Sequence, residues 1–322
     1  MGDLTAIPQR VERTIDLAAY LPPNSRLARV AAVPEKSVAV ITVRGEKSDI
    51  VLCVDFESAS PIISTWRSGT NPDRVVTSAD GERVFVTERG AWSVAAFELA
   101  TGRRTARLIG SQTHGLAASE KLLAVGTLDS KIVVFDLPEF SEVTQARYID
   151  PEAAIADLAL LTASGPIVAA DFAQSAMLVI DPLRPDSPRR VVTPAAPTCL
   201  AFDPILKRVY ASAPNAKELM VVNLKDLAGD VRSIERYPIP SGGTPLGLAV
   251  SPNAERVFVC VQDPDSVSVF HVDSHDWYPS LQTGVAPLGV VTTLDSKYVI
   301  VTNQQSVSIV AVRYGFGTDP SD

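Results

Sequence analysis

One phrase of the sequence returns along the chain with little change. Thr244–Val261 reads TPLGLAVSPNAERVFVCV, Ala286–Asn303 reads APLGVVTTLDSKYVIVTN and Asn71–Glu88 reads NPDRVVTSADGERVFVTE. Each copy predicts a short apolar strand, a polar hairpin turn and a second strand in which apolar and polar residues alternate. A strand pair of this kind cannot bury its apolar face alone, so the copies must pack against one another.

A third apolar strand follows each strand pair. The chain contains seven such strands, which start at Ile50, Trp92, Lys131, Ala176, Glu218, Ser266 and Ser306. The residues that precede successive first hairpin turns lie 41 to 48 residues apart, which is the usual spacing of propeller blades. We therefore predict an all-β fold, a seven-bladed β-propeller with four-stranded antiparallel blades, because the units have to close into a ring.

The number of strands predicts how the ring closes. The seventh unit ends after its third strand at Tyr314, whereas residues 10–17 (RVERTIDL) form an unpaired strand that resembles the fourth strand of a blade. We expect this N-terminal strand to complete the last blade, which leaves no free sheet edge at the seam. On this interpretation residues 1–322 form a single propeller domain, with residues 10–17 as its closing strand.

The net charge and the composition of the chain limit the classes of function that it can have. The chain has 29 Lys and Arg against 37 Asp and Glu, a net charge of -8, which disfavours binding to nucleic acid or to an anionic membrane surface. The N-terminus lacks the apolar core of a secretory signal, and no apolar run approaches the ~18 residues of a membrane helix, so we expect a cytoplasmic location. No Gly-rich phosphate loop opens a helix, and we expect no cofactor.

The three cysteines indicate neither a disulfide framework nor a metal centre. Cys53, Cys199 and Cys260 are far apart, odd in number and without the spacing of metal ligands. Cys53 and Cys260 lie in alternating strands, so we expect them to be buried as small hydrophobic residues.

Two of the repeats contain the motifs YVIVTN (Tyr298–Asn303) and VFVTE (Val84–Glu88), preceded by turns of the TLDSK and SADGE kind. In these motifs the chain resembles the YVTN-repeat family of seven-bladed propellers, within the lactonase-like superfamily. The resemblance covers essentially the whole chain and implies a short-loop propeller without a fused catalytic domain. It does not specify an activity, because such blades serve lactonases, lyases, surface proteins and scaffolds. The His-rich phrase of the lactonase propellers has no counterpart here.

Equivalent residues at the start of each innermost strand form rings around the mouth of the central channel of a propeller. Five residues before the end of each first strand, the ring contains Ala28, Asp73, His114, Asp157, Thr198, Leu246 and Leu288. One position later it contains Arg29, Arg74, Gly115, Leu158, Cys199, Gly247 and Gly289. The mouth is therefore predicted to be polar on one side and apolar on the other.

His114 is the centre of the predicted site, because Asp73 and Asp157 flank it from the neighbouring blades. A carboxylate can hold one imidazole tautomer while the other nitrogen exchanges a proton with a substrate. Arg29 and Arg74 could hold a carboxylate or an enolate oxygen in a bidentate contact. The alternative is structural, since polar residues at blade starts also bond the next blade or form ion pairs at the rim.

The loop after the second strand contributes further candidates on the same face. Arg44 and Glu88 could orient a ligand, and Trp92 could supply a planar stacking surface. Cys199 is assigned to the binding surface rather than to nucleophilic catalysis, because the sequence places no base beside it.

Two functions from different classes fit this pattern. The first is a cofactor-independent enzyme of the hydrolase, lyase or isomerase type, acting on a small organic molecule at the channel mouth. Its catalytic residues would be His114, Asp73 and Asp157, and its binding residues Arg29, Arg74, Arg44, Glu88, Trp92 and Cys199. The second is a non-catalytic propeller that binds a ligand or a protein partner through its rim.

Overall fold

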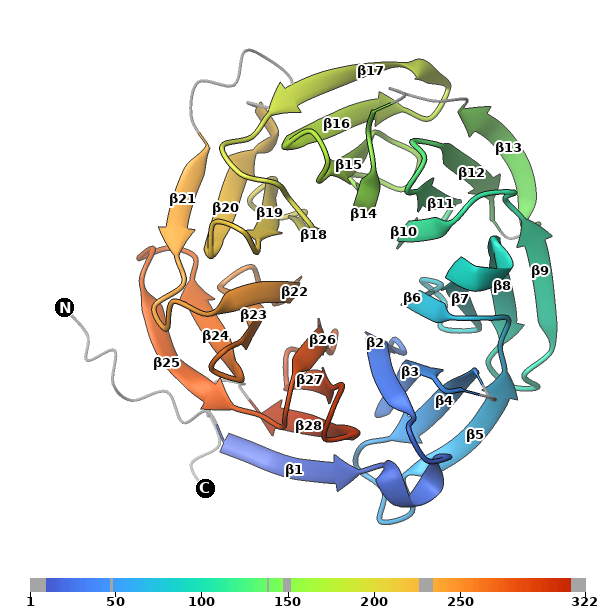
Figure 1. Ribbon diagram of the computed structural model, residues 1–322, viewed down its shortest axis with the longest axis vertical. Helices are drawn as coiled ribbons and strands as arrows, with labels where there is room; N and C mark the ends of the chain where they lie inside the picture. Colours follow the sequence, from blue (N-terminus) through green and yellow to red (C-terminus); the bar gives the residue numbers. More distant parts are fainter. Residues whose placement is uncertain (1–9, 47–48, 138, 147–151, 226–233, 314–322) are drawn as a thin grey trace.

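The computed structural model describes residues 10–46, 49–137, 139–146, 152–225 and 234–313, and nearly all of them belong to strands or to the turns between them. Seven four-stranded antiparallel sheets surround a central channel (Figure 1). The chain is therefore a seven-bladed β-propeller, which confirms the fold predicted from the repeats.

The strand bounds follow the predicted units. From the channel outward, the first three blades contain β2–β5 (Arg26–Ala32, Val38–Arg44, Ile50–Asp55, Ile62–Arg67), β6–β9 (Pro72–Thr77, Arg83–Glu88, Ser93–Glu98, Arg104–Leu108) and β10–β13 (Thr113–Ala118, Leu122–Thr127, Ile132–Asp136, Ser141–Ala146). The next three contain β14–β17 (Ile155–Leu160, Ile167–Asp171, Ala176–Asp181, Arg184–Val192), β18–β21 (Cys199–Asp203, Arg208–Ala213, Glu218–Asn223, Glu235–Pro238) and β22–β25 (Thr244–Val250, Arg256–Gln262, Ser266–His271, Trp277–Gln282). The seventh blade contains β26–β28 (Pro287–Thr292, Tyr298–Asn303, Ser308–Arg313) and β1 (Arg10–Asp16). Two single-turn 3-10 helices, η1 (Ala18–Tyr20) and η2 (Arg89–Ala91), lie between strands.

The N-terminal strand closes the ring. β1 pairs with β28 in antiparallel orientation, from Arg10 opposite Arg313 to Asp16 opposite Ser308. The amide of Leu17 extends this pairing by donating a hydrogen bond of 3.0 Å to the carbonyl of Val307. The predicted closure is therefore confirmed, and β1 is the outermost strand of the last blade (Figure 1).

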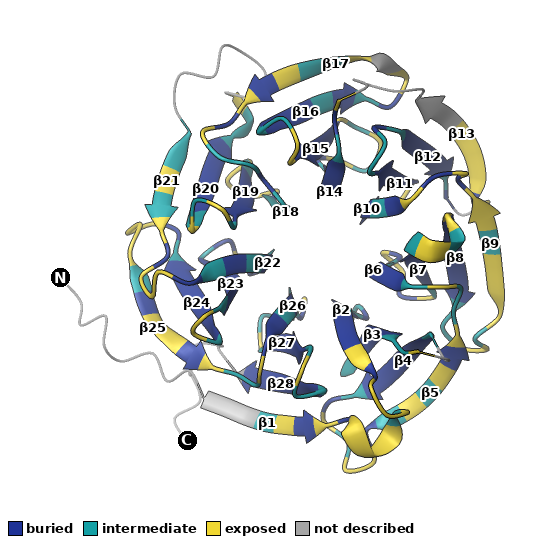
Figure 2. Ribbon diagram, in the orientation of Figure 1, coloured by how far each residue is buried: buried dark blue, intermediate teal, exposed yellow. Residues whose placement is uncertain are grey.

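The hydrophobic core is divided among the spaces between blades. The described residues form seven clusters of buried apolar side chains, each shared by two neighbouring blades. One of them joins Ile300 and Ile309 of the last blade to Ile41 and Leu52 of the first. The second and third strands of each blade are mostly buried, whereas the outermost strands are largely exposed (Figure 2). Each blade is thus stabilised by its neighbours, as expected of a repeat that cannot fold alone.

The innermost strands leave the regular ladder where they enter the channel. Register shifts against the second strand occur at the start of six of them, namely β2, β6, β10, β14, β22 and β26. In β6 the shift lies between Pro72 and Val75, so Asp73 and Arg74 are both within it. Because a bulge changes the direction of the side chains it contains, these shifts position the ring residues.

A hydroxyl on the second strand holds the start of the next blade in three places. The bonds run from Thr42 to the carbonyl of Asp73, from Ser212 to that of Leu246 and from Thr302 to that of Ala28, with lengths of 2.6, 2.7 and 3.1 Å. All three accepting carbonyls belong to the first of the two predicted rings. Neighbouring blades are therefore linked by hydrogen bonds directly beside the channel mouth.

Candidate functional site

Asp73 is the centre of a charged cluster at the channel mouth. Its carboxylate forms an ion pair with Arg44 and lies 3.8 Å from Nη1 of Arg89. The third neighbour is Nε2 of His114, at 3.5 Å. Burial disfavours the charged carboxylate, but Arg44 and the other cations nearby outweigh burial and hold the pKa of Asp73 below its usual value. The side chains of the three neighbours are 20 to 27% exposed, so this cluster is open to a ligand.

His114 is held as a neutral base. Its Nδ1 lies 2.6 Å from the carbonyl oxygen of Ala156 on the next blade, and because a carbonyl only accepts, Nδ1 carries the proton. Burial lowers the pKa of the imidazole to about 4, and the charge of Arg74 contributes in the same direction, while Asp73 opposes it. At neutral pH Nε2 is therefore an unprotonated nitrogen beside a carboxylate that would stabilise its protonated form.

Arg74 crosses the channel from the second blade to the fourth and fifth. Its Nη1 lies 3.2 Å from Oδ2 of Asp157 and 3.1 Å from Sγ of Cys199. Its Nη2 donates to the carbonyls of Ala156 and Thr198 at 3.2 and 3.3 Å. Burial acts against the charge, but the neighbouring Asp157 carboxylate outweighs it and raises the pKa of Arg74. Arg74 is thus a buried cation with a full set of protein partners on both amino groups.

Arg29 enters the channel from the first blade, next to the blade of Arg74, and lies against two glycine-containing strands, β22 and β26. Its Nη1 donates to the carbonyl of Leu288 at 2.8 Å and lies 3.9 Å from Sγ of Cys199. A Cβ at Gly247 would lie 3.0 Å from this Nη1 and 2.3 Å from the Leu288 oxygen. The sequence predicted that the Leu-Gly pairs make one side of the mouth apolar. The absence of a side chain at Gly247 also leaves space there for the Arg29 guanidinium.

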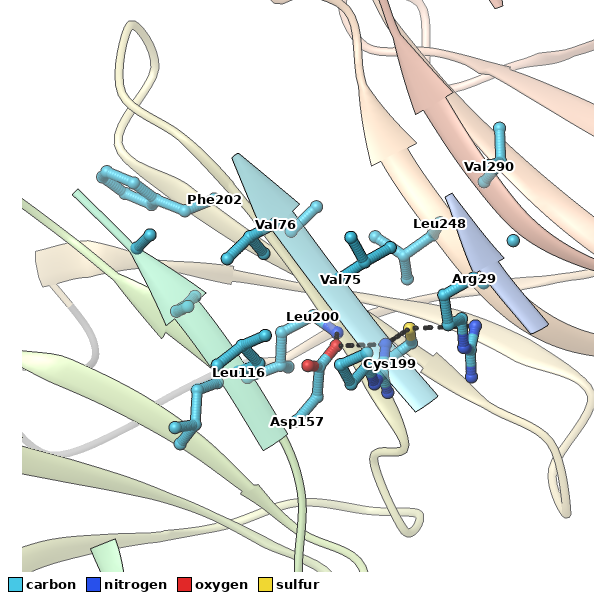
Figure 3. A pocket seen from close by; sticks show the side chains of 18 of the residues that line it. Arg29, Val75, Val76, Leu116, Asp157, Cys199, Leu200, Phe202, Leu248 and Val290 are labelled. Atoms are coloured by element: carbon cyan, nitrogen blue, oxygen red, sulfur yellow. Dashed lines mark hydrogen bonds and ion pairs between the residues drawn. The ribbon is translucent and has the colours of Figure 1, made fainter. Parts of the chain in front are cut away.

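A chamber of about 300 Å³ lies deeper in the channel, lined by the innermost strands of all seven blades. Its polar lining residues are Arg29, Arg74, Asp157 and Cys199, and the others are Val, Leu, Ala, Phe and Gly. Figure 3 shows Arg29, Cys199 and Asp157 together, with Phe202 away from them among apolar side chains. The chamber thus has one charged end and an apolar wall.

The structure brings some of the predicted site residues together and separates others. Asp73 contacts His114, as expected, and Arg44 joins them. Asp157 instead pairs with Arg74 and accepts a hydrogen bond of 2.9 Å from the Leu200 amide. The side of His114 that was expected to face Asp157 is bonded to the backbone carbonyl of Ala156.

The two candidates from the loop after the second strand of the second blade differ in burial. Glu88 is fully buried, and its carboxylate accepts hydrogen bonds from Ser93 at 2.6 Å, from the amide of Gly69 at 2.8 Å and from Arg104 at 2.5 Å. It therefore fixes the turns of the second blade. Trp92 directly follows η2 and is 53% exposed, which leaves its ring available for contact.

Several contacts of the site involve the backbone and were not found by sequence reasoning. The carbonyls of Ala156 and Leu288 accept hydrogen bonds from His114 and Arg29. The identity of a residue does not indicate whether its backbone carbonyl accepts such a bond. The bulge at the start of the innermost strands directs the side chains toward these carbonyls, and the hydrophobic pattern of the sequence does not reveal that bulge.

Within the described ranges of the chain, no three His, Cys, Asp or Glu side chains gather in a way that could hold a metal ion. No helix of the described chain is both long and apolar enough to cross a bilayer.

No protein-family model matches the sequence, and no curated protein matches it significantly. Solved propellers match it in structure. The β-propeller domain of Cps50 (Swd1) from Myceliophteria thermophila has a TM-score of 0.77 at 12% identity, with 96% of this chain and 100% of that chain covered. A streptogramin B lyase has a TM-score of 0.76 at 12% identity, with coverage of 94% and 97%. Hydrazine synthase of Kuenenia stuttgartiensis has a TM-score of 0.77 at 16% identity, with coverage of 94% and 99%. Similarity at this level concerns the fold alone.

Proposed function

We propose that the protein is a cofactor-independent enzyme that moves a proton on a small organic anion at the channel mouth. The observation that carries this proposal is the state of His114, whose Nδ1 is bonded to the Ala156 carbonyl and whose ring is neutral. Nε2 is then the group that accepts the proton. Asp73, 3.5 Å away, stabilises the imidazolium that forms, which is how a paired carboxylate assists a general base.

The charge of the site favours an anionic substrate. The mouth and the channel behind it contain four guanidinium groups, those of Arg29, Arg44, Arg74 and Arg89, against the carboxylates of Asp73 and Asp157. An excess of positive charge in a protein with a net charge of -8 concentrates anions at this point of the surface. Arg44 and Arg89 are partly exposed and lie beside Asp73 at the mouth, so we assign substrate contact to them, with Trp92 as a planar neighbour.

The reaction classes that fit are hydrolysis, elimination and isomerisation. Each of them needs a base and a cation that stabilises developing negative charge, and neither requirement involves a cofactor. The structural similarity to a streptogramin B lyase supports including elimination among these classes. Asp157 takes part as a positioning residue, because it holds Arg74, which in turn donates to the same Ala156 carbonyl as His114.

Turnover of a panel of small esters, lactones and hydroxy acids tests the proposal. Replacement of the base by His114→Asn should lower kcat/KM by roughly 10²- to 10⁴-fold, the range typical of general acid–base catalysis. In the wild type, kcat/KM should rise with pH around the His114 pKa of about 4 and be constant at neutral pH.

A matched control is available on the outer part of the sixth blade. His275 is exposed and lies in the turn between β24 and β25, the two outer strands of its blade, so His275→Asn should leave kcat/KM within twofold. Equal activities of the two variants on a substrate that the wild type converts would exclude His114 as the base.

A non-catalytic propeller is the second candidate. It is favoured by a groove of about 720 Å³ between the first two blades, lined by apolar and charged side chains that include the exposed Ile63. On this alternative the protein binds a ligand or a protein partner, and none of the compounds in the panel is converted.

The cytoplasmic location of the protein also stays a prediction from the sequence.

A further inference from the structure

We propose that the chamber behind the mouth is a separate binding site for a monocarboxylate with an unbranched apolar tail. Its carboxylate would lie against Arg29 at the charged end, and its tail would extend along the apolar wall. This inference is independent of a catalytic role for His114, because His114 and Asp73 are not among the residues that line the chamber.

The charged end of the chamber has an excess of positive charge. Arg74 is balanced by Asp157, at 3.2 Å. Within the described chain the Arg29 side chain has the Leu288 carbonyl and the Cys199 sulfur as hydrogen-bond partners and forms no ion pair with a carboxylate, although its charge reaches Asp73 and helps to lower the pKa of that residue. Its buried Nε and that of Arg74 have no hydrogen-bond partner. The chamber lining therefore contains two guanidinium groups, those of Arg29 and Arg74, against the single carboxylate of Asp157. A ligand carboxylate would balance the charge at this end and accept hydrogen bonds from a guanidinium.

The wall of the chamber is suited to a hydrocarbon chain. Apart from the four polar residues at the charged end, the lining side chains are aliphatic or aromatic, or absent at glycine. The lining continues along the innermost strands to Val76, Ala118, Leu160 and Phe202. These four are only half-buried, so the chamber opens at this end. A volume of about 300 Å³ is at the lower limit for ligand pockets, which favours a short chain.

Octanoate is the probe for the first experiment, with n-octylamine as the matched compound of opposite head-group charge. Octanoate should bind with one-to-one stoichiometry in a calorimetric titration, and octylamine should not bind, because its ammonium would face Arg29 and Arg74. From butanoate to octanoate the affinity should increase about fourfold per methylene group until the chamber is full. Comparable affinity for the amine, or no dependence on chain length, would overturn the proposal.

Variants then locate the site. Arg29→Gln should weaken octanoate binding roughly 10- to 100-fold, as expected for the loss of a charged hydrogen-bond donor. The control is Arg26→Gln, which removes the same charge from an exposed position on the same strand. Ala118→Phe should fill the open end of the chamber and abolish binding while leaving the Arg29 environment unchanged. Equal affinities of the Arg29 and Arg26 variants would exclude the site.

The chamber also provides a chemical readout. Cys199 lines it, whereas Cys53 and Cys260 are buried elsewhere. Octanoate should protect Cys199 from a small thiol reagent, as followed by peptide mass spectrometry, and the amine should not. His114→Asn should retain octanoate binding within twofold, so loss of turnover and loss of carboxylate binding report on two different sites. Cys199 labelling that is unaffected by octanoate contradicts the proposed location.

Discussion

Nη1 of Arg74 lies 3.2 Å from Oδ2 of Asp157, although the two residues belong to the second and fourth blades. The residue at the same ring position of the intervening blade is Gly115, which has no side chain to block the path. Both charged side chains are at least nine-tenths buried. The pair therefore bridges non-adjacent blades across the channel and orders its polar layer.

Removal of one partner of this pair should be strongly destabilising. Asp157→Ala leaves the Arg74 cation buried without its counter-charge, and we expect the free energy of unfolding in urea to fall by about 3–5 kcal/mol. The double variant Arg74→Met with Asp157→Leu removes both charges and should cost clearly less. A single variant that is no less stable than the double one would show that the charge balance is unimportant.

Stability should depend on pH through His114. Burial holds its folded-state pKa at about 4, below the ordinary value of 6.5, so the unfolded chain takes up the proton first as the pH falls. This contribution to the free energy of unfolding is complete above pH 6.5 and is lost progressively as the pH falls to about 4. The total loss is about 3 kcal/mol, at 1.36 kcal/mol per pH unit. Urea unfolding of wild type and His114→Asn between pH 4 and 7 measures it. Parallel pH profiles for the two proteins would argue against a buried neutral imidazole.

Closure of the ring depends on the apolar residues at the end of the N-terminal strand. Leu17 is fully buried in the cluster that joins the last blade to the first. Leu17→Ala should therefore lower the free energy of unfolding by about 2–5 kcal/mol. The exposed Thr14 on the same strand supplies the control, since Thr14→Ala should cost less than about 1 kcal/mol. Equal losses would mean that backbone pairing alone holds β1.

Glu88 should matter for stability and not for turnover. Its buried carboxylate accepts bonds from Arg104, Ser93 and Gly69, which together outweigh burial and lower its pKa. A glutamine amide has only one acceptor oxygen, and its NH2 group would face the remaining donors. Glu88→Gln should therefore lower the free energy of unfolding by about 2–3 kcal/mol, measured by thermal or urea unfolding. Glu98→Gln, at an exposed carboxylate paired with Arg103, should change stability little. A loss of kcat/KM in Glu88→Gln without loss of stability would return Glu88 to the binding site.

The fold could be predicted because its determinants are local and repeated. Alternation of apolar residues marks each strand, and the unpaired segment at residues 10–17 indicates the closure that β1 and β28 display. The ring positions also follow from the repeat, which is why Asp73 and His114 were expected to meet.

The remaining geometry of the site could not be predicted from residue types. His114 was placed between two carboxylates, yet a bulge at the start of β14 brings the Ala156 carbonyl to its Nδ1 and leaves Asp157 to Arg74. Likewise, Gly247 was interpreted as part of an apolar side, whereas it is the space into which Arg29 extends. Both differences arise from the local backbone geometry and from the length of side chains that extend across the channel. Neither can be predicted from the spacing of the repeats or from the composition.

The pairing of β1 with β28 has a consequence for synthesis on the ribosome. Asp16 and Ser308 are opposite each other in the sheet but about 290 residues apart in the chain. At roughly 5–20 residues per second, translation separates their appearance by about 15–60 s. During that interval the first strand has no partner, and a nascent chain must keep it from pairing with other sheet edges until the final blade emerges.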